Sequence, residues 1–354
     1  MKILVVSVLT VATTTVVAAQ TPTRPQFRSG VTLVELEVSV VGRNGQPVSR
    51  LQPSDFTVME SGRPQKIVSV TEHGLSTGQA VNEAAWDAQG QNESRLVTIV
   101  LDDAQIPRDA RITSRTKTIA RTIIASLDAS DRAAVVFTRN TRTSADFTTS
   151  HSHLAEVADG FLASYAGPGT SGSASGPLRM FEIRTSLSVL ESIARYLGTV
   201  PGRRKAIFYV SPGVSLPRQG SQDYNQALQL MRRVFDEAQR ANVMIHAIDP
   251  AGLASGPGTV IADSQAFGSG AARGLQSRHE FLIMLALNTG GRSIVDRNNP
   301  ERSVRQLLTQ HGHYYEVVYE STVAETEQPR KTEVQVARPG ATARFRSLNT
   351  TWIP

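Results

Sequence analysis

Two adjacent carboxylates, Asp102 and Asp103, are the side chains whose positions in this sequence best suit chemistry. They directly follow the apolar run Leu96–Leu101, in which Thr98 is the only polar residue. An unbroken apolar run that ends in charge predicts a central strand of a parallel sheet, buried on both faces. Ligands of open α/β sheets bind where such strands end, so we expect a site at Asp102 and Asp103.

Several kinds of catalysis lack their usual parts in this sequence. Phosphatases of the haloacid dehalogenase type need Asp-x-Asp at a strand end, whereas position 104 is Ala. The Gly-x-Ser-x-Gly match at residues 74–78 lies in the predicted linker and not between a strand and a helix, where a nucleophilic serine would have to stand, and the absence of cysteine excludes a thiolate nucleophile. The glycine-rich stretch 167–176 is not followed by the Gly-Lys-Ser/Thr of a phosphate-binding loop. A metal-dependent hydrolase at Asp102 and Asp103 stays open as an alternative.

Histidines offer a second candidate for metal binding. His151 and His153 form one close pair, and His311 and His313 form another. Spacing i, i+2 places both side chains on one side only in a strand, whereas these pairs fall in a Ser/Thr-rich loop and at a helix-to-strand joint. A zinc site would also need a third ligand, which the sequence does not identify. His246 lies in an apolar strand, where we expect a core histidine with satisfied hydrogen bonds.

The elements that must position these residues alternate between strand and helix from Arg95 onward. Strands are predicted at 96–101, 133–138, 205–211, 243–248 and 292–295, with an edge strand at 141–147. Helices are predicted at 112–127, 181–197, 224–241, 281–289 and 301–311, and residues 252–274 are predicted to be a long loop. Such alternation is typical of a parallel sheet with helical crossovers.

Both ends of the chain carry strand patterns of a different kind. Residues 31–41 alternate between apolar and polar residues, the hairpin signal Asn44-Gly45 follows, and residues 31–72 together are predicted to form a small β unit. A unit of this size needs another surface to pack on. Residues 314–320 and 331–337 are predicted to pair as C-terminal antiparallel strands, with 342–346 as a third strand.

Composition and the first residues indicate where the protein acts. A hydrophobic fraction of 40% and a charged fraction of 19% are typical of a globular protein, and the basic residues behind the net charge of +6 are scattered rather than grouped into a nucleic-acid face. Lys2, an apolar stretch to residue 17 and the small residues Ala18 and Ala19 predict a secretory signal peptide, with a retained membrane anchor as the alternative. We therefore expect a secreted or periplasmic protein without disulfides.

Four segments of the sequence together resemble the VWFA-related family of exported bacterial proteins, which contain a von Willebrand factor type A-like domain. The segments are VTIVLDDAQIP, VMIHAIDPAGL, the stretch from LALNTGGRSIVDRN to YYEVVYES with RKTEVQVARPG after it, and an N-terminal signature made of Leu51, Asp55, Phe56, Val58, Glu60, Gly62 and Gln65. The resemblance implies a Rossmann-like, von Willebrand factor A-type α/β sheet that is mostly parallel with helices on both faces. It also implies binding rather than catalysis.

In the parent domain, loops above the strand ends form a metal-ion-dependent adhesion site from Asp-x-Ser-x-Ser, a Thr and a further Asp. Asp102 matches the first Asp, but Ala104 and Ile106 replace the two serines. Ser211 or Pro212 stands where the further Asp would be. The resemblance therefore implies a degenerate adhesion site with no metal, and Mg²⁺ or Ca²⁺ at Asp102 and Asp103 is the alternative.

Thr148 or Thr149 is expected to stand for the threonine of the adhesion site. A structural role is also open for Asp102 and Asp103, which would then cap loops by accepting backbone N–H bonds. We predict no catalytic residue, and the predicted binding residues are Asp102, Asp103, Gln105, Thr148, Thr149 and Ser211.

These observations predict an exported, non-enzymatic binding or adhesion-type module whose partner is a protein or an envelope polymer. A hydrolase and a structural protein of the envelope are the alternatives. The predicted division of the chain is a signal peptide at 1–19, a linker at 20–30, the β unit at 31–72, a linker at 73–94, the von Willebrand factor A-like domain at 95–312 and C-terminal β strands at 313–354.

Overall fold

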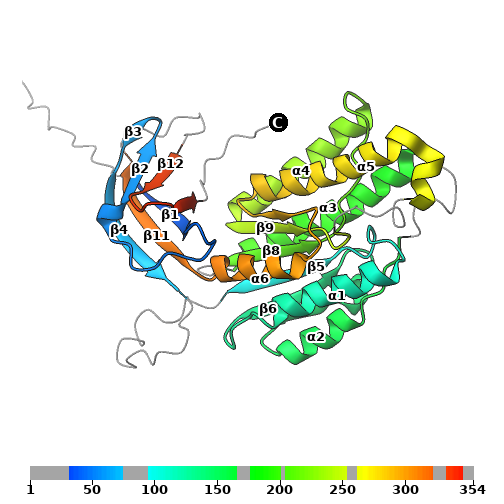
Figure 1. The fold of residues 1–354 in the computed structure, drawn as a ribbon, viewed down its shortest axis with the longest axis horizontal. Coiled ribbons are helices and arrows are strands. Elements are labelled where there is room, and N and C mark those ends of the chain that lie inside the picture. The colour runs from blue at the N-terminus through cyan, green and yellow to red at the C-terminus, as the bar shows by residue number, and fades with distance from the viewer. Residues whose placement is uncertain are drawn as a thin grey trace, which may run out of the picture.

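The structure is a computed structural model that describes residues 32–74, 95–165, 176–200, 204–252, 261–321 and 332–345. The predicted signal peptide, the linker at 20–30, nearly all of the linker at 73–94 and nearly all of the loop at 167–176 lie outside the described residues. Figure 1 shows two parts, a β part and an α/β part.

The α/β part is built on a six-stranded sheet with the order β10-β9-β8-β5-β6-β7. The strands are β5 (Leu96–Leu101), β6 (Arg132–Phe137), β7 (Ala145–Thr148), β8 (Lys205–Val210), β9 (Val243–Ile248) and β10 (Ser293–Ile294). All pairs are parallel except β6 with the edge strand β7. Every residue of β5, β8 and β9 is buried, which explains their unbroken apolar runs. The predicted α/β class and mostly parallel sheet are confirmed.

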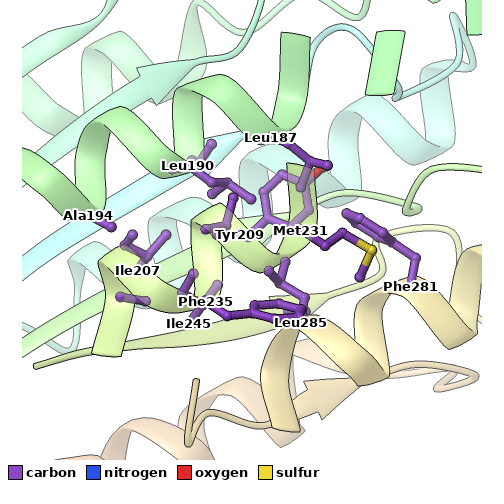
Figure 2. Close-up of a cluster of buried hydrophobic side chains, with 14 of the residues drawn as sticks. Leu187, Leu190, Ala194, Ile207, Tyr209, Met231, Phe235, Ile245, Phe281 and Leu285 are labelled. Atoms are coloured by element: carbon purple, nitrogen blue, oxygen red, sulfur yellow. The ribbon is translucent and has the colours of Figure 1, made fainter. Parts of the chain in front are cut away.

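Helices cover both faces of this sheet. On one face are α1 (Ala110–Ile124), α2 (His151–Asp159) and α6 (Pro300–His311), and on the other are α3 (Gly176–Gly198), α4 (Gln222–Arg240) and α5 (Ile261–Asn288). Their apolar stripes form one core on each side of the sheet. Figure 2 shows the core under α3, α4 and α5, in which Leu187, Met231 and Phe281 surround the ring of Tyr209.

Two predicted loop boundaries were wrong. Helix α5 begins at Ile261, inside the predicted loop at 252–274, and α3 begins at Gly176 rather than at residue 181. Glycine lowers helix stability by roughly 1 kcal/mol relative to alanine, which is why Gly268, Gly270 and Gly274 suggested a loop. The penalty is small enough for a long helix to continue through them.

The β part is a sandwich made from both ends of the chain. One sheet has the order β13-β1-β11-β4 and the other β12-β2-β3. The strands are β1 (Thr32–Val41), β2 (Phe56–Glu60), β3 (Arg63–Pro64), β4 (Lys66–His73), β11 (Tyr314–Ser321), β12 (Thr332–Val336) and β13 (Thr342–Phe345). Side chains of both sheets share one apolar core.

The predicted pairing of the C-terminal strands with each other was wrong. Strand β11 pairs with β1 and β4, while β12 pairs with β2 in the other sheet. In β11 the alternate residues Tyr315, Val317 and Tyr319 are buried, and β1 has the matching alternation, whereas β4 adds the half-buried Ile67 and Val70 to the same core. The N-terminal strands β1 to β4 and the C-terminal strands β11 to β13 therefore share one sandwich.

Direct contacts join the sandwich to the α/β part. Helix α6 leads into β11 (Figure 1). The Gln310 amide Nε2 donates to the Gly45 carbonyl at 2.6 Å, and Arg204 Nε lies 3.6 Å from Glu37 Oε2. The Arg204 guanidinium also lies 4.1 Å above the centre of the Tyr314 ring.

Candidate functional site

Asp102 follows the end of β5, next to the end of β8, and its side chain is completely buried. Its backbone N–H donates to the Val210 carbonyl at 3.0 Å. The carboxylate accepts bonds from four hydroxyl groups, which belong to Thr138 (2.6 Å), Ser186 (3.1 Å), Ser211 (2.9 Å) and Tyr209. We call Asp102 and these four residues the Asp102 cluster.

Opposing effects act on the protonation of the Asp102 cluster. Burial raises the pKa of Asp102, and the four hydroxyl donors oppose that shift because they stabilise the ionised carboxylate. Burial and the neighbouring carboxylate raise the pKa of Tyr209 well above its usual value, so its phenol keeps its proton. The cluster therefore consists of one acidic group surrounded by neutral donors.

The four donors come from three places in the chain. Thr138 follows β6, Tyr209 is in β8, and Ser211 comes just after β8. Ser186 belongs to the buried face of α3, where it lies between the apolar residues Ile183 and Leu190. Thr138, Ser186 and Tyr209 were not among the residues predicted for this site. A serine on the apolar stripe of a helix and a tyrosine in a buried strand were the available signals, since a buried hydroxyl needs a partner.

Asp103 has a different role, because it fixes the loop after β6. Its carboxylate accepts the backbone N–H groups of Arg139 at 2.7 Å and Asn140 at 3.0 Å, and it lies 3.1 Å from the Thr138 hydroxyl oxygen, whose proton is directed at the nearer Asp102. Its own carbonyl accepts from the Ser164 hydroxyl at 2.5 Å. This is the loop-capping role that the sequence left open for the two aspartates.

The structure brings some of the predicted binding residues together and separates others. Ser211 contacts Asp102, and Gln105 is 3% exposed with an Nε2 that has no hydrogen-bond partner in the part of the chain that the structure describes. The expected grouping is wrong for Thr148 and Thr149. Thr148 faces Ala133 at the start of β6, whereas Asp102 lies at the opposite edge of the sheet, because the antiparallel strand β7 runs back along β6.

The residues of the Asp102 cluster do not fit an adhesion-type metal ion. Such an ion needs oxygen ligands with free lone pairs and open positions for water or a partner's carboxylate. Here the four hydroxyls direct their protons at the one carboxylate, which is 0% exposed. In the described ranges, no three His, Asp or Glu side chains are grouped so that they could hold a metal ion.

A second charged group lies at the same edge of the sheet. His279 of α5 places Nε2 3.1 Å from Asp249 Oδ2 after β9, and Nδ1 3.3 Å from Asp296 Oδ2 after β10. The hydrogen bond to Asp249 is the main reason that the pKa of His279 is raised. Because carboxylates occupy both ring nitrogens, His279 ties three elements together and has no nitrogen left for proton transfer.

The two histidine pairs do not converge on a zinc site. His151 Nε2 lies 3.2 Å from the Asp131 carbonyl, while His153 is exposed on the same helix. His313 Nε2 lies 2.8 Å from Glu72 Oε1, while His311 is buried. His246 is buried as predicted, but only one ring nitrogen is hydrogen-bonded, since its Nδ1 accepts from the Arg292 N–H and its Nε2 has no partner within the described ranges.

The loops above the strand ends are themselves well covered. Residues 102–106 and 211–214 are buried, whereas Arg108, Arg139 and Arg218 in the loops after β5, β6 and β8 are exposed. Any partner at this edge therefore meets an arginine-bearing rim before it meets the carboxylates. Across the described ranges, none of the helices is both long and apolar enough for a membrane span.

Comparisons with known proteins add little to this picture. No family model and no curated protein matches the sequence. Among solved structures, the chain is similar to the PilB minor pilin from Streptococcus sanguinis (9% identity, 62% of each chain covered, TM-score 0.32). It is also similar to the pilus adhesin SpaC from Lactobacillus rhamnosus GG in an open conformation (8% identity, TM-score 0.35), covering 81% of this chain and 44% of that one. A third similar structure is the human COPII-coat protein Sec24c (8% identity, TM-score 0.28), and that match covers 79% of this chain and 44% of Sec24c. The chain thus spans less than two thirds of each of these proteins, and likeness at these TM-scores carries no argument about function.

Proposed function

We propose that this chain is an exported, non-enzymatic binding module of the von Willebrand factor A type that binds a protein or envelope polymer without a metal ion. The order of elements from β5 to α6, with an edge strand after the second strand of the sheet, is the order on which the sequence resemblance rests. The proposal places the binding surface at the strand ends, where ligands of open α/β sheets bind.

The observation that carries this proposal is the state of Asp102. A hydrolytic carboxylate must touch water, a metal ion or the substrate. Asp102 is 0% exposed and accepts four internal hydroxyl bonds, and Asp103 is used by backbone N–H groups. These internal contacts support a role of both carboxylates in holding the loops, as the proposal of a binding module requires.

Metal dependence is tested by thermal unfolding of the protein in EDTA and in millimolar Mg²⁺ or Ca²⁺, with Asp102→Asn beside the wild type. We expect the melting temperature to be the same in all three solutions. Isothermal titration of the wild-type protein with each metal provides a second readout should the variant not fold. A rise of several degrees with metal that Asp102→Asn abolishes would overturn the metal-free part of the proposal. Metal-dependent turnover of phosphate or ester substrates, lost in a folded Asp102→Asn variant, would establish the hydrolase instead.

The binding surface is tested by charge reversal at the rim. Arg139 and Arg218 are exposed in loops over the strand ends, so Arg139→Glu and Arg218→Glu should weaken retention of partners from envelope extracts. Arg305→Glu, on the exposed face of α6, is the matched control. Equal retention by all three variants would contradict a binding surface at the strand ends.

A further inference from the structure

A cavity of about 480 Å³ lies between the β sandwich and the α/β part. Its walls come from β1 and β13 on one side, and from β9, β10 and the end of α6 on the other. The volume is in the range of small-molecule sites. Arg204, which precedes β8, lines it, so the cavity lies at the opposite edge of the sheet from the Asp102 cluster.

Positive charge dominates the lining of this cavity. Three guanidinium groups, from Arg204, Arg292 and Arg344, face one carboxylate, that of Glu37. Glu37 is 3.6 Å from Arg204, and within the described part of the chain no carboxylate makes an ion pair with Arg292 or Arg344. The three arginines and one glutamate of the lining therefore leave an excess of two positive charges.

The electrostatics of Arg292 agree with this excess. Burial lowers the pKa of Arg292, and the nearby charge of Arg344 lowers it further. The Arg292 guanidinium donates to the Gln310 side-chain oxygen, a neutral acceptor that leaves the charge uncompensated. Two like charges held close together gain from an anion placed between them.

Two histidines in the cavity lining, His246 and His311, contribute no positive charge to it. Burial lowers the pKa of His246 to about 3 and that of His311 well below its usual value, so both rings are neutral. Because His246 Nδ1 accepts the Arg292 N–H at 3.1 Å, the ring proton is on Nε2, which has no partner among the described residues. Hydrogen-bonding capacity thus remains unused beside the two arginines.

We infer that this cavity binds a small oxyanion, a ligand that carries a phosphate or carboxylate group. Arginine side chains recognise both groups through paired N–H donors. Because Arg344 belongs to β13 and Arg292 directly precedes β10, the bound oxyanion would bridge the sandwich and the α/β part. This site is separate from the strand-end surface of the proposed function.

Isothermal titration of the full chain with inorganic phosphate and, separately, with citrate tests the inference at constant ionic strength. We expect one ligand per chain and a Kd at least about tenfold weaker in Arg344→Gln, since a hydrogen bond to a charged group is lost. Arg344 is exposed, so this variant should fold, which circular dichroism verifies. Arg305→Gln removes the same charge from the exposed face of α6 and should bind like the wild type.

The two ligands distinguish the sources of the oxyanion. Binding of phosphate alone assigns the site to a phosphate-bearing ligand, and binding of citrate alone assigns it to a carboxylate. Absence of binding for both ligands, or equal Kd values for Arg344→Gln and Arg305→Gln, overturns the inference. None of these readouts depends on binding at the strand ends, so the two proposals can fail separately.

Discussion

The Asp102 carboxylate is buried away from solvent, and hydroxyl groups of the protein donate the hydrogen bonds that water would donate to an exposed carboxylate. Hydrogen bonds to a charged group are stronger than those between neutral groups, and a buried charge that loses one keeps the full cost of its desolvation. Removing one hydroxyl around Asp102 should therefore lower the free energy of unfolding by more than removing a hydrogen bond between neutral groups.

Ser186 provides a direct test, since its hydroxyl reaches both Asp102 oxygens, at 3.2 and 3.1 Å. Ser186→Ala should lower the free energy of unfolding by about 1–3 kcal/mol, measured by urea denaturation. Ser188→Ala is the control on the same helix, because Ser188 is exposed and donates only to carbonyls of its own helix. We expect it to stay within about 0.5 kcal/mol of the wild type. Equal losses in the two variants would show that the hydroxyls are not important to Asp102.

His279 should make stability depend on pH. Its pKa is raised in the folded protein above the usual value, which is about 6.5 in an unfolded chain. The folded state thus binds the proton more tightly, so this stabilisation is complete below about pH 6.5 and is lost as pH rises through the raised pKa. The difference in unfolding free energy between wild type and His279→Gln should be roughly 1–3 kcal/mol at pH 6 and shrink toward pH 9.

The control for this titration is His153→Gln, because His153 is exposed on α2. His246 and His311 act in the opposite direction, since burial lowers the pKa of each and acid should destabilise the protein through them. They are present in both proteins and cancel in the difference. A wild-type advantage that stays constant from pH 6 to pH 9 would contradict the charged role of His279.

The sequence predicted where Asp102 and Asp103 lie in the sheet better than it predicted which residues surround them. The apolar run before Asp102 and Asp103 was enough to place both at a strand end. Thr138 and Ser186 reach Asp102 from 36 and 84 positions away, and that proximity depends on how β6 and α3 pack. Thr148 was misplaced because a short edge strand has no pattern that tells parallel from antiparallel pairing.

Among the elements, the loop after β8 is held closely against α5. Gly213 has φ +81°, and a Cβ at this position would lie 2.5 Å from the Arg278 carbonyl oxygen. Gly220 has nearly the same backbone conformation, with φ +83°, but a Cβ there would meet no atom within 4 Å. The pair separates the cost of the backbone conformation from the cost of the contact.

Both Gly213→Ala and Gly220→Ala should lose about 1–2 kcal/mol of unfolding free energy, because alanine is strained at positive φ. Gly213→Ala should lose roughly 1–3 kcal/mol more, since the loop or α5 must move. Thermal and urea unfolding of the two variants give the comparison. Indistinguishable values would mean that the loop can shift away from α5 at no cost.

The long elements with a regular burial pattern were predictable, because residues that are buried together appear in the sequence as apolar runs or as apolar residues at regular spacing. Strands β5, β8 and β9 are buried along their whole length and read as apolar runs. The start of α5 was not predictable, since its glycines weigh against a helix and the elements that follow in the chain decide the outcome.

For the whole molecule, the sandwich makes the two ends of the chain one folding unit. Val38 of β1 pairs with Tyr315 of β11, and the core of the sandwich holds side chains from both ends. The sequence could not reveal this, because any strand with alternating burial can pair with any other that has the same alternation. A destabilising substitution in the C-terminal strands should therefore also destabilise the N-terminal strands that pair with them.

Val317→Ala in β11 tests this coupling. Val317 is 0% exposed, and its truncation should cost roughly 2 kcal/mol. Hydrogen exchange followed by mass spectrometry should show faster exchange in β1 and β4, with β5 unchanged. The reciprocal control, Val135→Ala in β6, should speed exchange in β5 and leave β1 unchanged. Equal acceleration in both parts would instead describe a molecule that opens as one unit.

The position of the α/β part between the two halves of the sandwich also has a consequence for biosynthesis. A ribosome releases β1, β2 and β4 long before β11, β12 and β13 exist, while β5 to α6 emerge as one continuous stretch. The α/β part can thus acquire its structure first, and the early strands must wait with unpaired edges until the last strands arrive. During that delay, a chaperone that shields exposed strands would be most useful to the nascent protein.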